Sequence, residues 1–195
     1  MHSSLRVPGR MVACCLLAAA STLVYSQAAA PAKPAVGTVV APAQVYGKLL
    51  TLLEKGFVSA AEAMPEEKYG FAPTAALGEF KDARTFGEEL KHVADANYYF
   101  FGGTLSDDEA KAKTEAIKKL KTKAEIVQSV KDSFVQAHSF VDGITPENAF
   151  VTMANGGTRA GMASFGIAHF MDHYGQMAVY LRLNGIVPPA SRPGN

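Results

Sequence analysis

Apolar residues at helical spacing recur in four segments of this chain, and proline or glycine residues separate the segments. Each segment spans several helical turns, and its apolar residues recur every three or four positions, which is typical of amphipathic helices. No stretch alternates apolar and polar residues between turn signals, so strands are not expected. Four such helices in one small domain predict an all-α four-helix bundle, and the longer connections leave the direction of each helix open.

Start and stop signals place these segments along the chain. Pro65 ends the first segment, and either Asp82 or Thr85 can cap the start of the second. Ser106 and Glu109 form a capping-box pattern at the start of the third. The predicted helices therefore run from about 43 to 64, from 82 or 85 to 102, from 106 to 141 in two stretches that meet near 123, and from 158 to 184.

The N-terminal residues have the composition of a secretory signal peptide. Arg6 and Arg10 precede an apolar run over residues 11–24, and small residues favour cleavage near Ala28. An uncleaved membrane anchor is the alternative. However, the second half of the uncharged stretch consists mainly of serine, glutamine and alanine, which are too weakly apolar for the hydrocarbon core of a bilayer. We therefore expect a signal peptide over 1–28, an Ala/Pro linker over 29–42 and the helical domain over 43–192, in a secreted or periplasmic protein.

Charge and cysteine content exclude several classes of partner and site. Both cysteines, Cys14 and Cys15, lie in the predicted signal peptide, so the mature chain has no thiolate nucleophile and no cysteine metal ligand. Removal of Arg6 and Arg10 changes the formal net charge from +1 to −1, so neither a nucleic-acid partner nor a stable membrane anchor is expected. The lysines within 111–123 could contact a polyanion, but their interleaved glutamate favours a solvated helix face.

Two histidines of the last helical segment, His169 and His173, are spaced as two ligands of one metal ion require. Residues four apart lie on one helical face, one turn from each other. A helical wheel at about 100° per residue places them in a stripe that we expect to be buried, together with Met162, Phe165 and Tyr180. The alternative is a pair of core histidines satisfied by other partners, and Phe170 excludes the zinc-protease pattern.

The remaining histidines leave two interpretations open. His92 lies at the edge of the apolar arc of the second segment, where it can either reach inward as a third ligand or stay partly exposed. Three neutral imidazoles on facing helices would form a cation site with open positions. His138 is either a fourth ligand, a substrate contact or a satisfied boundary residue. Asp95 and Asp172 are candidate acceptors for imidazole N–H groups, or else solvated helix carboxylates.

Three stretches resemble the signatures of the DinB-like superfamily. They are Thr85 to Tyr98 (TFGEELKHVADANY), His169 to Gln176 (HFMDHYGQ) and Tyr180 to Pro189 (YLRLNGIVPP), and the resemblance extends over about 43–192. It implies a four-helix bundle of up-down-down-up topology and a metal site whose ligands are His92, His169 and His173. It also implies a divalent ion, most often zinc or nickel and sometimes iron or manganese. Characterised members include thiol S-transferases and a maleylpyruvate isomerase, and homodimers are common among them.

The sequence departs from the family pattern at Tyr174, where members often have arginine. The wheel places Tyr174 away from the metal stripe, so metal ligation should be unaffected. Three glycines also lie in the last segment; of these, Gly166 either permits close helix approach, makes room for a ligand or merely weakens the helix.

From these observations we expect an exported protein that binds a divalent metal ion. It would act on a small-molecule substrate as a metal-dependent transferase or hydrolase, with Gln176 and Tyr180 as ligand-binding donors that face the pocket. The alternative is a non-catalytic, metal-stabilised bundle that binds a ligand or dimerises. The sequence identifies no catalytic residue.

Overall fold

The computed structural model describes residues 33–103 and 105–194. The regular structure of this part of the chain is helical: α1 (Pro42–Ala63), α2 (Phe86–Phe101), α3 (Asp107–Lys119), α4 (Lys123–Asp142) and α5 (Arg159–Leu183), with short 3-10 turns at η1 (Glu66–Lys68), η2 (Ala75–Leu77) and η3 (Pro189–Ser191). The all-α prediction is confirmed, and the third predicted segment forms the two helices α3 and α4. The predicted signal peptide, both cysteines and residues 29–32 of the predicted linker lie outside the described residues.

Side-chain caps define where most of the helices begin. Thr85, Ser106 and Thr122 each accept a hydrogen bond from the backbone N–H three residues later, and the glutamate at that position accepts one from the backbone N–H of the cap. Thr158 caps α5 in a simpler way, through the N–H of Gly161. These bonds satisfy N–H groups that the first helical turn leaves without partners. Of the two caps considered for α2, the structure uses Thr85.

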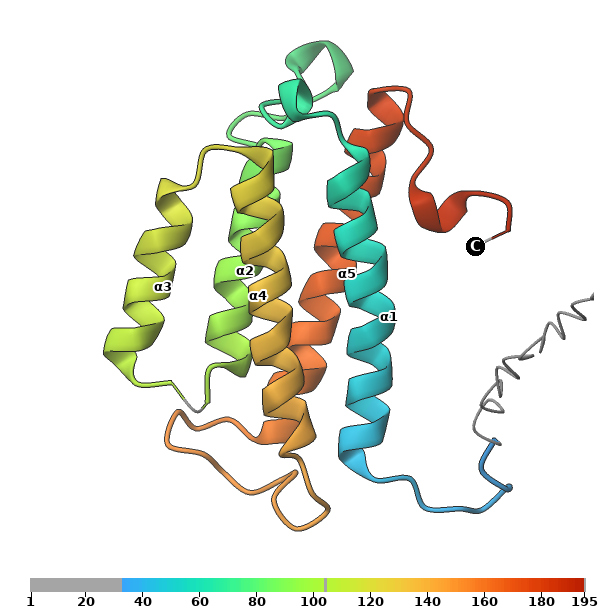
Figure 1. The fold of residues 1–195 in the computed structure, drawn as a ribbon, viewed down its shortest axis with the longest axis vertical. Coiled ribbons are helices and arrows are strands. Elements are labelled where there is room, and N and C mark those ends of the chain that lie inside the picture. The colour runs from blue at the N-terminus through green and yellow to red at the C-terminus, as the bar shows by residue number, and fades with distance from the viewer. Residues whose placement is uncertain (1–32, 104, 195) are drawn as a thin grey trace, which may run out of the picture. The chain divides into compact units, whose positions relative to one another are not determined.

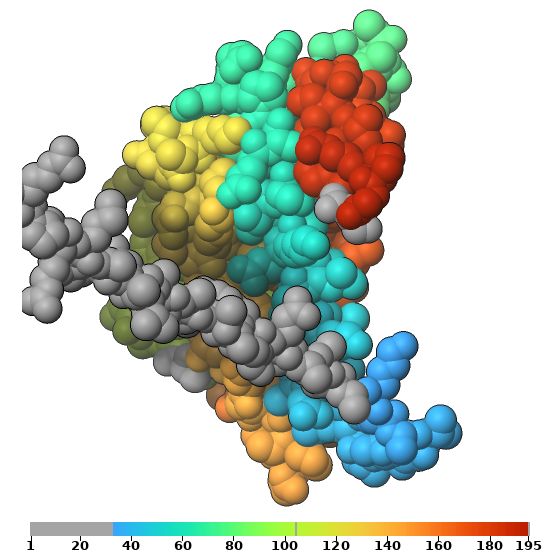
Figure 2. Space-filling model, turned by 45° about the vertical axis from the view of Figure 1, so that its right-hand side comes forward, coloured from blue at the N-terminus to red at the C-terminus, as the bar shows by residue number. Residues whose placement is uncertain are grey.

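Four of the helices pack around one core, and α3 lies beside them (Figure 1). Both α1 and α2 pack against α4 and α5, whereas α3 packs chiefly against α2. Ile117 is the buried residue of α3, and the lysines on that helix are exposed, as expected for a solvated face. The short turn η3 packs against α1, and the C-terminal segment lies beside that helix (Figure 2). No helix in the described residues is long and apolar enough to span a bilayer.

Phenylalanine rings fill the centre of the bundle. Phe101 on α2 stacks on Phe170 of α5 with ring centroids 5.8 Å apart, and contacts Phe140 of α4 edge-on at 5.7 Å. Phe134 of α4 lies 5.1 Å from Phe170. These buried aromatic contacts join three helices and fix how closely α5 approaches α2.

Gly166 of α5 lies tightly packed against side chains of α2. A Cβ atom at this position would lie 2.5 Å from Cζ of Phe101 and 3.2 Å from Cβ of Phe100. Of the three roles considered for Gly166, the structure therefore supports close helix approach. At Tyr174, on a different face of α5, the ring lies against Gly56 of α1, which agrees with its predicted position away from the histidines.

The apolar residues at helical spacing in α1 are Val45, Leu49, Leu52, Leu53 and Phe57, and only part of this stripe is buried. On α1, Val45, Leu49 and Leu52 are exposed, Leu52 by 68%, whereas Leu50 and Phe57 are buried. Both faces of α1 carry leucine, so periodicity alone does not select one, and α1 packs through the side that also holds two buried alanines, Ala60 and Ala61.

On α5, Phe165 is 64% exposed, although the wheel placed it in the buried stripe. The buried stripe instead runs through Ala163, Gly166, Phe170, His173 and Met177. Because this stripe is rotated from the predicted one, His169 lies at its edge and is only partly buried. His173 is therefore buried in the bundle, and His169 lies nearer to its surface.

The connection from α1 to α2 is fastened to the bundle at several points. The backbone N–H of Phe86 donates to the carbonyl of Phe71 at 2.8 Å, and that of Gly87 donates to the carbonyl of Tyr69 at 2.8 Å. The hydroxyl of Tyr180 on α5 donates to the carbonyl of Arg84 at 3.0 Å. These bonds hold the residues just before α2 against the end of α5.

Candidate metal centre

The three predicted metal ligands converge on one point between α2 and α5. Nε2 of His169 lies 3.2 Å from Nε2 of His92 and 3.1 Å from Nε2 of His173. One ring nitrogen from each histidine lies within 4.8 Å of the others. The helical spacing brings His169 and His173 together, and the close packing of α2 on α5 adds His92.

The geometry of this histidine cluster fits a bound cation. Zinc–nitrogen bonds of about 2.0–2.1 Å, at angles between octahedral and tetrahedral, would separate the ligating nitrogens by roughly 2.8–3.4 Å. Two of the three separations, 3.1 and 3.2 Å, lie within that range, and all three are within 4.8 Å. Imidazole nitrogens suit zinc, nickel, iron and copper, so the chemistry of the donors fits as well. The three histidines can therefore hold a metal ion.

A buried carboxylate forms a hydrogen bond with one of these histidines, at the ring nitrogen that does not face the cluster. Nδ1–H of His173 donates to Oε2 of Glu89 on α2 at 2.6 Å, and the Glu89 side chain is 2% exposed. The guanidinium of Arg84, which is 47% exposed, lies 3.7 Å from the other carboxylate oxygen. A chain of polar contacts thus runs from the surface at Arg84 through Glu89 to His173.

Sequence reasoning missed Glu89 and named two other carboxylates as candidate acceptors for imidazole N–H groups. Asp95 instead accepts a hydrogen bond from Thr114 of α3, and Asp172 accepts one from Gln176 at 3.0 Å. The one sequence signal for Glu89 is its position three residues before His92, since Glu-x-x-His is a metal-site pattern of helical bundles. Here, however, the carboxylate contacts the histidine of the opposite helix.

Burial keeps two of the histidines in the neutral form that binds metal. Desolvation, together with the neighbouring charges of His173 and His92, lowers the pKa of His169 to about 4. Desolvation is also the main cause that lowers the pKa of His92, and the positive charge of Arg84 adds to it. Because a metal ligand must offer an unprotonated nitrogen, these directions favour coordination at neutral pH.

Aromatic rings form one wall of the histidine cluster. The ring of Phe100 lies 5.2 Å from that of His169, and Phe165 contacts Phe100 edge-on at 5.3 Å. Phe100 is buried while Phe165 is exposed, so this wall runs from the core to the surface. The sequence did not suggest that Phe165, which adjoins the cluster through Phe100, is accessible to solvent.

The other candidate residues from the sequence, Gln176, Tyr180 and His138, are not part of the histidine cluster. Tyr180 is buried, and its hydroxyl is bonded to the carbonyl of Arg84, while the amide of Gln176 donates to Asp172. Whether Tyr180 and Gln176 hold a ligand stays a prediction. His138 lies elsewhere, on α4, where its Nε2 is 3.0 Å from a carboxylate oxygen of Glu54 on α1. It takes no part in the cluster.

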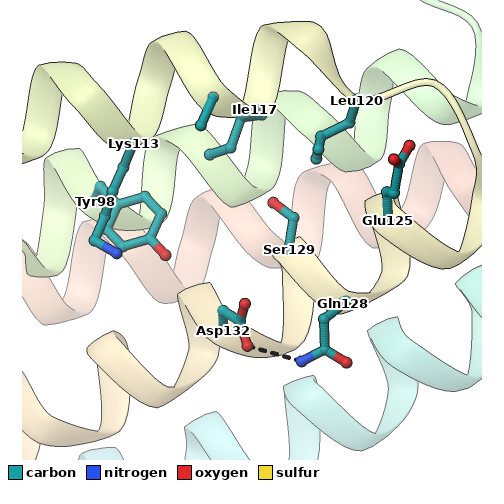
Figure 3. Close-up of a pocket in the computed structure, with 9 residues that line it drawn as sticks. Tyr98, Lys113, Ile117, Leu120, Glu125, Gln128, Ser129 and Asp132 are labelled. Carbon is teal, nitrogen blue, oxygen red and sulfur yellow. Dashed lines mark hydrogen bonds between the residues drawn. The ribbon is translucent and has the colours of Figure 1, made fainter.

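A separate groove of about 340 Å³ lies between α3 and α4 (Figure 3). Tyr98 and Ile117 contribute apolar surface, and the ammonium of Lys113 lies 5.0 Å from the ring centroid of Tyr98. Gln128 donates to Asp132 along one edge. The residues that line this groove include none of the three clustered histidines, so it is distinct from the candidate metal centre.

Comparison with known proteins identifies the family. No curated protein matches this chain. The family model of the DinB superfamily matches residues 49–177, which is more than half of the sequence and includes His92, His169 and His173. The chain therefore belongs to the DinB superfamily.

Proposed function

We propose that this chain is an exported protein that binds one divalent metal ion through Nε2 of His92, His169 and His173. The observation that carries the proposal is the convergence of these three nitrogens, with separations of 3.1 and 3.2 Å between neighbours. Nitrogen lone pairs directed at one another repel unless a proton or a cation lies between them. Zinc or nickel is the ion we expect first, with iron or manganese as alternatives.

The proposed reaction is a metal-dependent transfer or hydrolysis of a small molecule. A divalent ion with three neutral protein ligands keeps its full charge and has open positions, so it would act as a Lewis acid toward a substrate. Phe100 and Phe165 would exclude water from one side of that substrate. The exposed guanidinium of Arg84 carries a positive charge near the cluster, which favours an anionic substrate.

A second, non-catalytic function has a specific observation in its favour. The three ligands come from two different helices, His92 from α2 and the other two from α5. A metal ion bound there would cross-link α2 to α5 and stabilise the bundle without any reaction. In that case the protein would serve as a ligand-binding or dimerising module.

Several finer features belong to the same proposal. We propose that α1, α2, α4 and α5 form the up-down-down-up bundle of the superfamily, with α3 returning the chain between α2 and α4; their pairwise packing supports this. Export, cleavage of the signal peptide near Ala28 and homodimer formation are also proposed, from the sequence and the family resemblance.

Elemental analysis of the purified protein tests metal binding, with His169→Ala as the comparison. We expect the wild-type protein to carry about one divalent ion per chain and the variant to carry much less. Equal metal content in the two proteins would refute both functions. If metal is present, a thiol-transfer assay before and after chelation then distinguishes them, because only the enzyme would lose turnover with its metal.

A further inference from the structure

The buried carboxylate of Glu89 is the least expected charged group in this fold. It is 2% exposed, and its two oxygens contact His173 and Arg84. Burial of a carboxylate in a helical bundle is costly unless its partners satisfy it. Only part of that cost is offset by Arg84, because its guanidinium is 47% exposed and stands 3.7 Å away. The shorter contact, 2.6 Å, is made with His173.

That contact determines which nitrogen of His173 can bind a metal ion. An ionised carboxylate can only accept hydrogen bonds, so Nδ1 of His173 must carry the proton. In a neutral imidazole, Nε2 is then the unprotonated nitrogen, and Nε2 is the atom that faces His169 at 3.1 Å. Glu89 therefore selects the tautomer of His173 that the proposed metal site requires.

The neighbouring ligand His169 lacks such support. Its Nδ1 is buried and has no hydrogen-bond partner among the described residues. The nearby Asp172 bonds to Gln176 instead of to this ring. The two ligands lie on the same helix, one turn apart, but they differ at Nδ1. That nitrogen contacts a carboxylate in His173 and has no hydrogen-bond partner in His169 within the described part of the chain.

We propose that Glu89 is the positioning residue of the metal site, and that its negative charge strengthens His173 as a metal ligand. This inference rests on the proposed function, since it needs a bound metal ion. A carboxylate behind an imidazole holds the ring in place and increases the electron density on the ligating nitrogen. Loss of such a partner typically weakens metal affinity by about 10–100-fold.

The test separates the charge of Glu89 from its hydrogen bond. Glu89→Gln keeps the size and an acceptor oxygen but loses the charge, and Glu89→Leu loses both. Zn²⁺ affinity is measured by competition with a chromogenic chelator. We expect about a tenfold weaker affinity for Glu89→Gln and up to about 100-fold for Glu89→Leu.

Asp172→Asn provides the matched control, because it also removes one negative charge beside the histidines without touching a ring nitrogen. We expect its Zn²⁺ affinity to change by less than about threefold. Long-range ¹H–¹⁵N spectra of the histidines add a readout that a purely structural role would not change. His173 should show the Nδ1–H tautomer in the wild type and a mixture of tautomers in Glu89→Leu.

The possible outcomes distinguish this inference from the function on which it rests. If the wild type binds no more Zn²⁺ than His169→Ala, the proposed function is wrong and the inference falls with it. If the wild type binds Zn²⁺ but both Glu89 variants bind it as tightly as Asp172→Asn does, the function stands and the inference is wrong. Circular dichroism of each metal-free variant verifies that the helices are retained.

Discussion

Replacement of Gly166 by alanine should destabilise the protein, although alanine is the better helix former. A Cβ atom at this position would lie 2.5 Å from Cζ and 2.7 Å from Cε2 of Phe101. Carbon atoms in good contact are about 3.5–4.0 Å apart, so either the ring or α5 must move by roughly 1 Å. The ring has little freedom, because Phe101 is fully buried between Phe140 and Phe170.

Two opposing terms set the magnitude of this effect. Overpacking of a dense core costs about 1–3 kcal/mol. Alanine in place of glycine inside a helix contributes about 1 kcal/mol of stability in the opposite direction. Gly175 provides the control, because it lies in the same helix and a Cβ there meets nothing within 4 Å. Subtracting the two variants removes the propensity term and leaves the overpacking cost.

Urea unfolding of the metal-free variants, followed by circular dichroism, measures both free energies. We expect Gly175→Ala to be about 1 kcal/mol more stable than the wild type and to exceed Gly166→Ala by about 1–3 kcal/mol. Displacement of Phe100 should also weaken Zn²⁺ binding in Gly166→Ala, since that ring lies 5.2 Å from His169. Equal stabilisation by both substitutions would refute the close approach of α5 to α2.

Three further predictions concern the metal, a helix cap and His138. Zn²⁺ at a free concentration 100 times its Kd should stabilise the wild type by about 2.7 kcal/mol in thermal unfolding, and an equal gain in His169→Ala would contradict the proposed ligands. Thr122→Ala should lower the free energy of unfolding by about 1 kcal/mol at pH 7 in urea titrations, and an unchanged midpoint would show that this cap contributes nothing. Hydrogen bonds from Thr122 and Lys121 hold the pKa of Glu125 below its ordinary value of 4.5, so the contribution of this cap is present above that pH and is lost as the pH falls through the lowered value. Glu125→Gln, which removes the titrating carboxylate, should therefore lose less stability than the wild type when urea titrations are repeated below pH 4.5. His138→Ala should leave the metal content unchanged and cost at most about 1 kcal/mol in urea titrations, because its partner Glu54 is partly exposed; a loss of metal would place His138 in the site.

Local sequence signals predicted most of the helices. The caps at Thr85 and Ser106 and the stop at Pro65 act within a few residues of themselves, so they could be recognised without any tertiary information. The pair His169 and His173 was recognisable for the same reason, because four residues make one helical turn. His92 was placed in the site by family resemblance, and its ring does meet the other two.

The buried face of α1 and the contact between Glu89 and His173 depend on long-range packing, so they could not be predicted from local sequence patterns. α1 carries leucine on two faces, so the choice of Leu50 over Leu49 depends on what α4 and α5 present to it. Glu89 looked like an ordinary acidic residue in the first turn of a helix, where the helix dipole favours it. Its contact with His173 joins residues that are 84 positions apart, and no local pattern reports such a pair.

The fastened connection before α2 offers a practical place to attach a reporter. Its last residues are held by Tyr180 and by the backbone of Tyr69 and Phe71, whereas residues 74–82 are exposed. An exposed loop between fixed ends tolerates insertion well. Since the mature chain is expected to have no cysteine, a single one introduced there would take a fluorescent dye at one position. Such a label would lie a few residues from Arg84 and could report metal binding without altering any of the three histidines.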